Sequence, residues 1–241
     1  MNRVTAILPA AGLGTRMGGE KPKQFLVLDG VPLLVFTLRR LAVCPAITDF
    51  VIATRAEEMD SVAASVELEN LGRPVHMVRG GDTRQDSVAN ALVEVPPDSD
   101  LILVHDAVRP LVTRSQIERV IAEANACDAA ILGIPAMDTV KEVKRATPQA
   151  GGADVALITA TIPRERVVLA QTPQVFRASL LLEAFARARQ DGVSASDEAG
   201  LVERLGRDVH VVLGSERNLK ITRSGDMELA EFYFRQERAV Q

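Results

Sequence analysis

Short apolar runs recur through the first half of this chain, and segments with helical periodicity separate them. The runs are Val4–Leu8, Phe50–Ala53, Val75–Val78, Leu101–Val104 and Ala129–Ile134. The helical segments between them cover residues 32–41, 56–70, 83–93 and 115–124. Strands that are apolar on both faces are typical of parallel sheets covered by helices on each side. The pattern therefore predicts an α/β fold, with a mostly parallel sheet and helices on both faces.

This alternation is interrupted between residues 138 and 171. Two β-prone pieces, Thr139–Val143 and Val155–Thr161, flank the turn sequence TPQAGGADV. They predict a β-hairpin arm inserted at about 138–171. A two-stranded hairpin is only marginally stable alone, so we expect it to pack on something, such as a second subunit.

The pattern after the arm returns to helices and one strand. Helices are expected at 178–189, 198–205 and 225–235, and a strand at 209–213. No repeat or linker marks a boundary, so residues 1–241 are predicted to form a single domain that carries the arm.

The composition excludes several classes of protein. A net charge of -4 argues against non-specific nucleic-acid binding, which needs a basic surface. Two cysteines, Cys44 and Cys127, are too few and too far apart for a disulfide framework or a metal cage. No apolar stretch approaches the roughly 20 residues of a membrane span. With no signal peptide expected either, we predict a cytoplasmic protein that does not bind membranes.

The loop after the first strand predicts a phosphate site. Pro9-Ala10-Ala11-Gly12-Leu13-Gly14 has almost no side chains, so backbone N–H groups can approach an anion closely. Three cations follow: Arg16, Lys21 and Lys23. The alternative interpretation is a small-residue turn with incidental surface lysines, which the added Pro22 and Gln24 disfavour.

The sequence departs from two standard phosphate-binding motifs at specific residues. Met17 stands where a dinucleotide fold needs its third glycine, and Glu20 stands where a P-loop needs its lysine. What remains, G-x-G-T-R-M followed by P-K, resembles the loop of nucleotidyltransferases that move a nucleoside monophosphate onto a phosphorylated sugar or polyol.

Two further strand ends carry candidate binding residues. Gly80 and Gly81 would let the backbone lie against a flat base, and Ser87 falls in the first turn of the next helix. The simpler alternative is an ordinary strand–helix turn capped by Thr83. After the next strand, Asp106 is placed to help hold Mg²⁺.

Other charged residues near these strand ends allow more than one interpretation. Arg109 is suited to a phosphate, and the alternative is a structural Asp106–Arg109 pair. We interpret His105 as structural or orienting. His76 and His210 are each expected inside a strand, with no sign of a metal cluster.

Taken together, the chain resembles the 2-C-methyl-D-erythritol 4-phosphate cytidylyltransferases of the non-mevalonate route to isoprenoids. The segments that carry the resemblance are PAAGLGTRM, PKQ, GGDTRQDSV, VHDAVRP, DTVK, QTPQVF, SDEA and NLKITR. The resemblance implies a Rossmann-like core whose β-arm interlocks two subunits in a homodimer. It also implies transfer of CMP from CTP to a polyol phosphate, with Mg²⁺ or another divalent cation.

The resemblance also implies roles for individual residues. Arg16 and Lys23 would act on the transition state, and Lys220 and Arg164 would position the acceptor, Arg164 from the partner's arm. The residues implied to bind CTP are Ala10, Ala11, Gly12, Gly14, Gly81, Asp82, Arg84 and Ser87. Those implied around the acceptor are Asp106, Arg109, Thr139, Thr172 and Ser196, with Asp106 also at the metal.

The implied reaction needs no general base. The nucleophile is a phosphate oxygen, already largely ionised at neutral pH because its second pKa is about 6. Positioning and charge stabilisation then supply the catalysis. Alternatives left open are ribitol 5-phosphate or another sugar phosphate as acceptor, and a nucleotide-binding regulatory module without catalysis.

Overall fold

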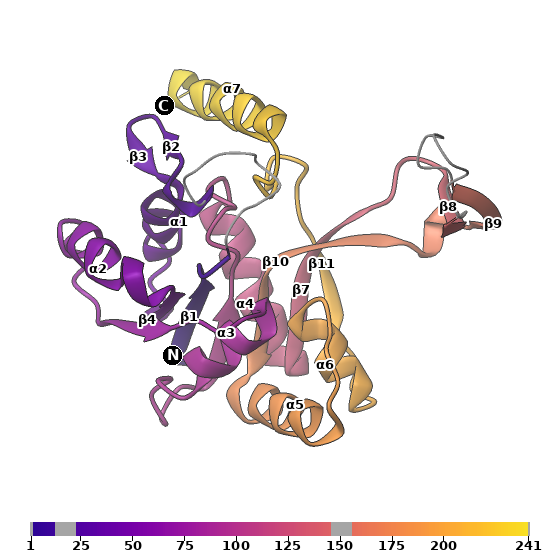
Figure 1. Cartoon of the computed structure of the whole chain (residues 1–241), viewed down its shortest axis with the longest axis horizontal. Helices are drawn as coiled ribbons and strands as arrows, with labels where there is room; N and C mark the ends of the chain where they lie inside the picture. The colour runs from indigo at the N-terminus through magenta and orange to yellow at the C-terminus, as the bar shows by residue number, and fades with distance from the viewer. Residues whose placement is uncertain (1, 13–22, 146–155, 241) are drawn as a thin grey trace.

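A seven-stranded sheet forms the centre of the computed structural model, which describes residues 2–12, 23–145 and 156–240. The strand order is β11-β7-β10-β6-β1-β4-β5 (Figure 1). The strands are β1 (Val4–Pro9), β4 (Ile47–Thr54), β5 (Val75–Arg79), β6 (Leu101–Val104), β7 (Ala129–Pro135), β10 (Val168–Arg177) and β11 (His210–Leu213). Among these strands, only β10 runs antiparallel to its neighbours. The predicted α/β fold with a mostly parallel sheet is confirmed.

Helices cover both faces of this sheet. One face packs on α1 (Leu33–Ala42), α2 (Met59–Glu67) and α4 (Arg114–Cys127). The other packs on α3 (Arg84–Leu92), α5 (Ala178–Asp191) and α6 (Glu198–Arg204). Successive strand residues serve opposite faces: Leu101 and Leu103 join the first core, Ile102 and Val104 the second. This double burial explains why β6 is apolar at every position.

The last helix, α7 (Ser224–Val240), packs on a third, smaller core. That core includes Leu28, Leu33, Phe36 and Leu111. A short hairpin of β2 (Val27–Leu28) and β3 (Val31–Pro32) contributes to it, and Figure 1 shows α7 above this hairpin. Among the described residues, no helix has the length and apolar character needed to cross a membrane.

Strand β10 is the main element that the local sequence pattern does not predict. Its sequence VLAQTPQVFR carries polar residues and a proline, which obscure its strand character. Its pairing with β7 is irregular between Ala170 and Gln174, and this irregular stretch contains Thr172.

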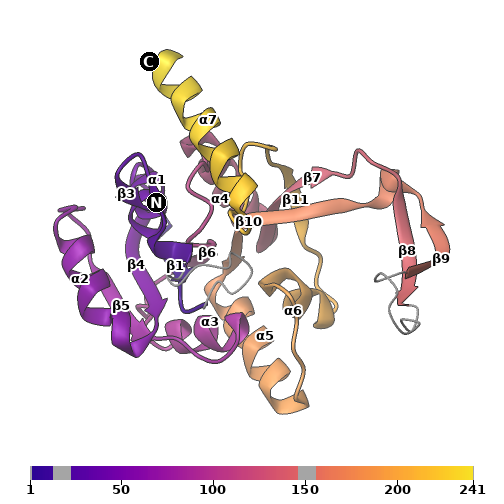
Figure 2. The same cartoon turned by 45° about the horizontal axis from the view of Figure 1, so that its top comes forward.

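The predicted arm is present as a hairpin of β8 (Val140–Arg145) and β9 (Ala156–Ile162). It pairs antiparallel, with Val140 opposite Ile162, and forms a sheet of its own. Figures 1 and 2 both show it standing away from the core, joined to it by the ends of β7 and β10. Every residue of β9 is exposed. The arm therefore has no packing partner among the described residues of its own chain.

Helix α3 begins with the predicted cap. The Thr83 hydroxyl accepts from the Asp86 N–H, and the Asp86 side chain accepts from the Thr83 N–H, so α3 begins with a capping box. Helix α1 begins at Leu33, one residue later than the predicted segment 32–41, and Pro32 is its N-cap residue. The described ranges also contain short 3₁₀ turns at η2 (Lys23–Phe25), η3 (Ala56–Glu58) and η4 (Arg164–Arg166).

Candidate active site

A pocket of about 200 Å³ lies where β1, β5 and β6 end. These strands run in the same direction, so their carboxyl ends meet at one edge of the sheet, where α/β folds bind ligands. The pocket is lined by Pro9, Ala10, Ala11, Gly12, Gln24, Gly81, Asp82, Thr83, Arg84, Ser87, Asp106, Ala107, Val108 and Lys220.

One wall of the pocket is bare backbone. A Cβ atom added to Gly80 would overlap the Ala11 side chain, and one added to Gly81 would overlap the Asp86 side chain. Ser87 fixes the wall, because its Oγ accepts from the Gly81 N–H at 3.1 Å and donates to the Thr83 carbonyl at 2.9 Å. The loops after β1 and β5 therefore lie back to back, leaving a side-chain-poor surface on which a flat group can rest.

Asp106 lies at the centre of a cluster of cations. Its Oδ1 accepts from Arg84 Nε at 3.1 Å, and its Oδ2 contacts Lys220 Nζ at 2.9 Å and Arg109 Nε at 3.3 Å. Burial alone would raise the pKa of this carboxyl group, but the three cations outweigh burial and hold it well below its ordinary value. Asp106 is therefore ionised at all physiological pH values.

Arg84 is held from its other side by Glu198, at the start of α6. Arg84 Nη1 and Nη2 donate to the two carboxylate oxygens at 2.7 and 2.9 Å, a bidentate pair. Glu198 is almost completely buried. Although burial opposes the charge of Arg84, its two carboxylate partners raise the pKa of its guanidinium above the ordinary value.

His105 orients the strand end that carries Asp106. Its Nε2 lies 3.1 Å from the Arg109 carbonyl, which can only accept, so Nε2 carries the proton. Its Nδ1 then accepts from the Thr172 hydroxyl at 3.0 Å, and the same hydroxyl accepts from the Asp106 N–H. Burial lowers the pKa of His105 to about 4, so the ring is neutral. The structural or orienting role predicted for His105 is the one these bonds give it.

The segment that carries Lys220 is tied to the same strand ends. Arg109 Nη1 donates to the Asn218 carbonyl at 2.7 Å, and the Ile221 N–H donates to the Val108 carbonyl at 3.0 Å. The buried Asn218 side chain donates to the Thr172 carbonyl at 2.8 Å. These three hydrogen bonds, made by the neighbouring residues Asn218 and Ile221, fix the backbone position of Lys220 independently of its own side-chain contacts.

The structure brings most of the predicted nucleotide residues together. Of these, the ones that line the pocket are Ala10, Ala11, Gly12, Gly81, Asp82, Arg84 and Ser87. Asp106 and Lys220 also line the pocket. Arg109 and Thr172 do not line it, but each forms a hydrogen bond with Asp106. Gly14 and Arg16 lie outside the described residues. For Lys23 the structure describes only the backbone, in η2.

Three predicted residues lie apart from this pocket. Thr139 and Ser196 are exposed, and neither belongs to the pocket lining. Arg164 lies at the base of the arm, where its Nη1 donates to the Met137 carbonyl at 2.6 Å. Arg164 is not among the residues that line the pocket of its own chain.

No contact is predicted from the sequence for three residues that shape the site. Glu198 anchors Arg84, Asn218 anchors the Lys220 segment, and Gln24, which the sequence indicates only as part of the loop pattern, donates to the Ala10 carbonyl at 2.7 Å. All three are buried polar side chains. Each falls inside a segment that carries the family resemblance, SDEA, NLKITR or PKQ, and that position was the available signal.

Comparisons with known proteins agree over nearly the whole chain. The family model described as 2-C-methyl-D-erythritol 4-phosphate cytidylyltransferase matches residues 4–236. The enzyme of that name from Acidobacterium capsulatum is 52% identical over 97% of this chain and 98% of its own. The one from Solibacter usitatus is 49% identical over 98% of each.

Solved structures give the same result. The 4-diphosphocytidyl-2C-methyl-D-erythritol synthase of Anaerococcus prevotii superposes with a TM-score of 0.82 at 27% identity, covering 97% of this chain and 99% of its own. The cytidylyltransferase of Thermus thermophilus gives 0.75 at 34% identity, covering 98% and 100%. With the family matched from end to end and the glycine-walled pocket in place, this chain belongs to the 2-C-methyl-D-erythritol 4-phosphate cytidylyltransferase family.

Proposed function

We propose that this protein transfers CMP from CTP to 2-C-methyl-D-erythritol 4-phosphate and releases pyrophosphate. The observation that carries the proposal is the convergence of Arg84, Arg109 and Lys220 on Asp106, at the wall of a pocket that is also lined by the small residues Ala10, Ala11, Gly12 and Gly81. The whole chain would act as one nucleotidyltransferase domain. In the proposed roles, the residues around CTP are Ala10, Ala11, Gly12, Gly14, Gly81, Asp82, Arg84 and Ser87.

The reaction brings two polyanions together, and the charges at Asp106 suit that task. Three cationic groups meet two carboxylates there, Asp106 and Glu198, so positive charge is in excess where phosphate groups would meet. Lys220 is the most accessible of the three, with one third of its side chain exposed. We infer that Lys220 exchanges its contact with Asp106 for one with the acceptor phosphate. Arg16 and Lys23 would supply further charge at the α-phosphate.

A divalent cation, Mg²⁺ in the simplest case, is part of the proposal. Mg²⁺ is usually held by one or two carboxylates together with phosphate oxygens, and Asp106 offers carboxylate oxygens at the pocket wall. Asp106 already contacts Arg84, Arg109 and Lys220, so it would hold the ion once Lys220 turns to the acceptor phosphate, with triphosphate oxygens as further ligands. When bound, Mg²⁺ would neutralise charge on the triphosphate. The acceptor's own phosphate oxygen is the nucleophile, so no residue of the chain needs to remove a proton.

The substrate is tested by measuring pyrophosphate release with each of four nucleoside triphosphates and a small panel of polyol phosphates. We expect turnover with CTP, Mg²⁺ and methylerythritol 4-phosphate. Comparable turnover with UTP, or faster turnover with ribitol 5-phosphate, would reject this substrate assignment. Nucleotide binding without pyrophosphate release from any pair would instead identify a regulatory module.

The arm is proposed to join two copies of the chain in a homodimer. Its hairpin and adjoining segments expose large apolar side chains: Met137, Val143, Leu157, Ile158 and Leu169 are each more than half exposed. Such an exposed apolar set is typical of a protein–protein interface. In the proposed dimer, Arg164 reaches the partner's pocket, and Thr139, Thr172 and Ser196 line the region of the acceptor.

A mixed dimer tests the shared site. If Arg16 and Arg164 of different chains serve one site, a dimer of Arg16→Ala with Arg164→Ala has one doubly damaged site and one intact site. Equal amounts refolded together should regain about a quarter of wild-type activity, because random pairing makes half of the dimers mixed. Arg16→Ala refolded with Arg166→Ala, an exposed neighbour on η4, is the matched control for refolding. Confirmed Arg16→Ala/Arg164→Ala heterodimers without recovery would reject the shared site.

A further inference from the structure

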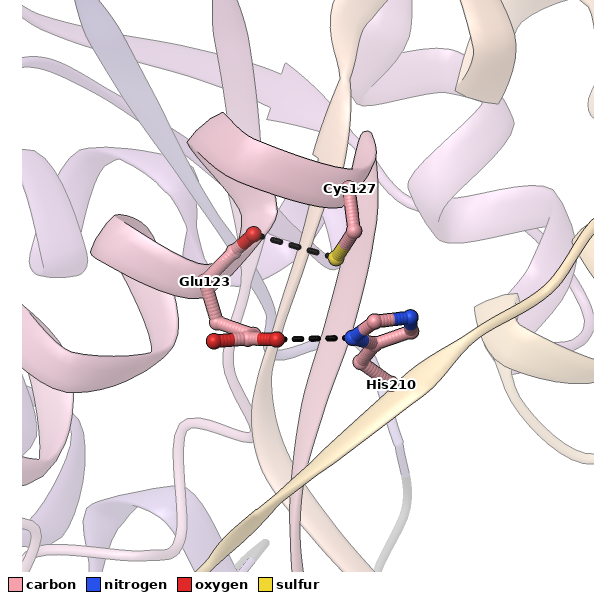
Figure 3. A group of neighbouring side chains, drawn as sticks. All are labelled: Glu123, Cys127 and His210. Atoms are coloured by element: carbon pink, nitrogen blue, oxygen red, sulfur yellow. Dashed lines mark hydrogen bonds and ion pairs between the residues drawn. The ribbon is translucent and has the colours of Figure 1, made fainter.

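Three side chains with metal-binding atoms meet on the surface far from the pocket. Glu123 and Cys127 lie one turn apart on α4, and His210 is the first residue of β11. Their carboxylate oxygen, thiol sulfur and imidazole nitrogen all lie within 4.8 Å of one another. Figure 3 shows the imidazole and the carboxylate facing each other, with the sulfur beside them. The sequence pattern gives no sign of this cluster, because His210 and Cys127 are distant along the chain.

The cluster lies at the amino ends of the parallel strands, whereas the candidate active site lies at their carboxyl ends. The pocket is at the carboxyl ends of the parallel strands, whereas His210 begins β11 and pairs in register with Ala130, near the start of the parallel strand β7. Cys127 ends α4, just before β7 begins. None of the three residues lines the pocket. Any ion held here is therefore separate from the Mg²⁺ proposed at Asp106.

The backbone already places the three groups for a shared ligand. Residues four apart on a helix project from the same face, which aligns Glu123 with Cys127. His210 is fixed by strand pairing and contacts Glu123, with Nδ1 to Oε1 at 2.7 Å. In a tetrahedral zinc site with bonds of about 2.0–2.3 Å, neighbouring ligand atoms are about 3.3–3.8 Å apart. The widest separation among the three atoms, at most 4.8 Å, exceeds that spacing by about 1 Å, which side-chain movements would have to close on binding.

We propose that Glu123, Cys127 and His210 form a binding site for a transition-metal ion of the zinc class. A thiolate and an imidazole select zinc, cobalt or nickel over Mg²⁺ and Ca²⁺, which prefer oxygen donors alone. One carboxylate, one thiolate and one imidazole supply three ligands, and water completes the tetrahedron, because His210 is half exposed. On binding, the thiol releases its proton to solvent and its sulfur bonds to the metal.

The ion would link the edge strand β11 to helix α4. In the described part of the chain, β11 pairs along one side only, with β7. The side-chain bonds to it from α4 are Glu123 to His210 at one end and Arg119 Nη2 to the Leu213 carbonyl, at 2.8 Å, at the other. A metal bond would replace one of these anchors, the surface contact between Glu123 and His210. The site therefore predicts a structural stabilisation of β11 rather than a catalytic effect.

Cobalt is the probe, because its spectrum reports a sulfur ligand directly. We expect one Co²⁺ per chain in reducing, non-chelating buffer, with tetrahedral d–d bands and a thiolate-to-cobalt charge-transfer band that Zn²⁺ abolishes by displacement. Cys127→Ser should lose the charge-transfer band, although Cys44 remains. His210→Ala and Glu123→Gln should weaken Zn²⁺ binding, measured by calorimetry, by about 100-fold or more, since even outer-shell changes cost about 10- to 100-fold.

Matched controls come from the same elements and residue types. Glu118→Gln changes another exposed glutamate on α4, and His76→Ala changes an exposed histidine at a strand position in β5; both should bind Zn²⁺ like the wild type. The proposal is overturned if no charge-transfer band forms, or if the band survives in Cys127→Ser. Equal Zn²⁺ affinity in the wild type, His210→Ala and Glu123→Gln would overturn it as well. These readouts are independent of catalytic activity.

Discussion

Replacing Glu198 by glutamine tests whether a buried ion pair, remote from any reacting atom, holds the candidate site together. Glu198 is 1% exposed, and both its oxygens accept from Arg84. Glutamine has nearly the same volume and keeps one oxygen acceptor, but it loses the charge and places an amide N–H₂ against a guanidinium. The change therefore isolates the electrostatic part of the contact.

The expected cost can be worked from the contacts. Removing one partner of a buried ion pair costs about 3–5 kcal/mol. Here Arg84 keeps its bond to Asp106 and one bond to the new amide oxygen, so we expect about 2–3 kcal/mol. For a chain of this size, 1 kcal/mol shifts the melting temperature by about 2–4 °C, which predicts a decrease of about 4–12 °C.

Activity should fall as well, because Arg84 lines the pocket. Loss of one charge-assisted hydrogen bond, worth about 1.5–3 kcal/mol, predicts a decrease in kcat/KM of about 10- to 100-fold, mainly through KM for CTP. Glu203→Gln, an exposed site on the same helix, is the control and should stay within about 0.5 kcal/mol of the wild type. Calorimetry and urea unfolding measure stability, and pyrophosphate release measures activity. If Glu198→Gln and Glu203→Gln have the same stability and the same activity, Glu198 does not position Arg84.

Two further predictions follow from the same site. His105 is neutral when folded because burial lowers its pKa from 6.5 to about 4, whereas the unfolded chain binds the proton near 6.5. Stability is therefore lost as pH falls from 6.5 to 4, by about 3 kcal/mol, and His105→Asn should lack this component in unfolding measured across that range. Arg16→Ala and Lys23→Ala should each lower kcat by about 100- to 1,000-fold with little change in KM for CTP. A raised KM at constant kcat would instead mark them as ground-state binders.

Local patterns in the sequence are sufficient for the elements whose burial is uniform. Leu101–Val104 is apolar at every position and forms β6 with the expected bounds. Thr83 is predicted as a helix cap, and its capping box forms. The arm is predicted from an interruption of the alternation, and its strands differ by only a few residues from those expected. In each case the determining signal lies within one continuous segment of the chain.

Contacts between distant segments could not be predicted in the same way. Arg84 and Glu198 are 114 positions apart, so no local pattern pairs them. Strand β10 is stabilised by its neighbours β6 and β7, although its own sequence includes Thr172 and Pro173. Glu123 and His210, 87 positions apart, meet only because β11 returns to the edge beside β7. The sequence can single out an individual residue in such a contact, but it does not show which distant residue that side chain touches.

The back-to-back loops at Gly80 and Ala11 have a consequence for how this enzyme can diverge. A methyl group at position 80 would occupy the space of the Ala11 side chain, so the two positions share a volume that holds one methyl group. Which residues are tolerated at position 80 therefore depends on the residue at position 11, and the reverse. Gly80→Ala alone should be harmful, whereas adding Ala11→Gly should restore part of the loss, with the Ser87 hydroxyl still close to the new methyl group. Across related sequences, a larger residue at one position should be accompanied by glycine at the other, a correlated pair that records physical contact between the two loops that form one wall of the pocket.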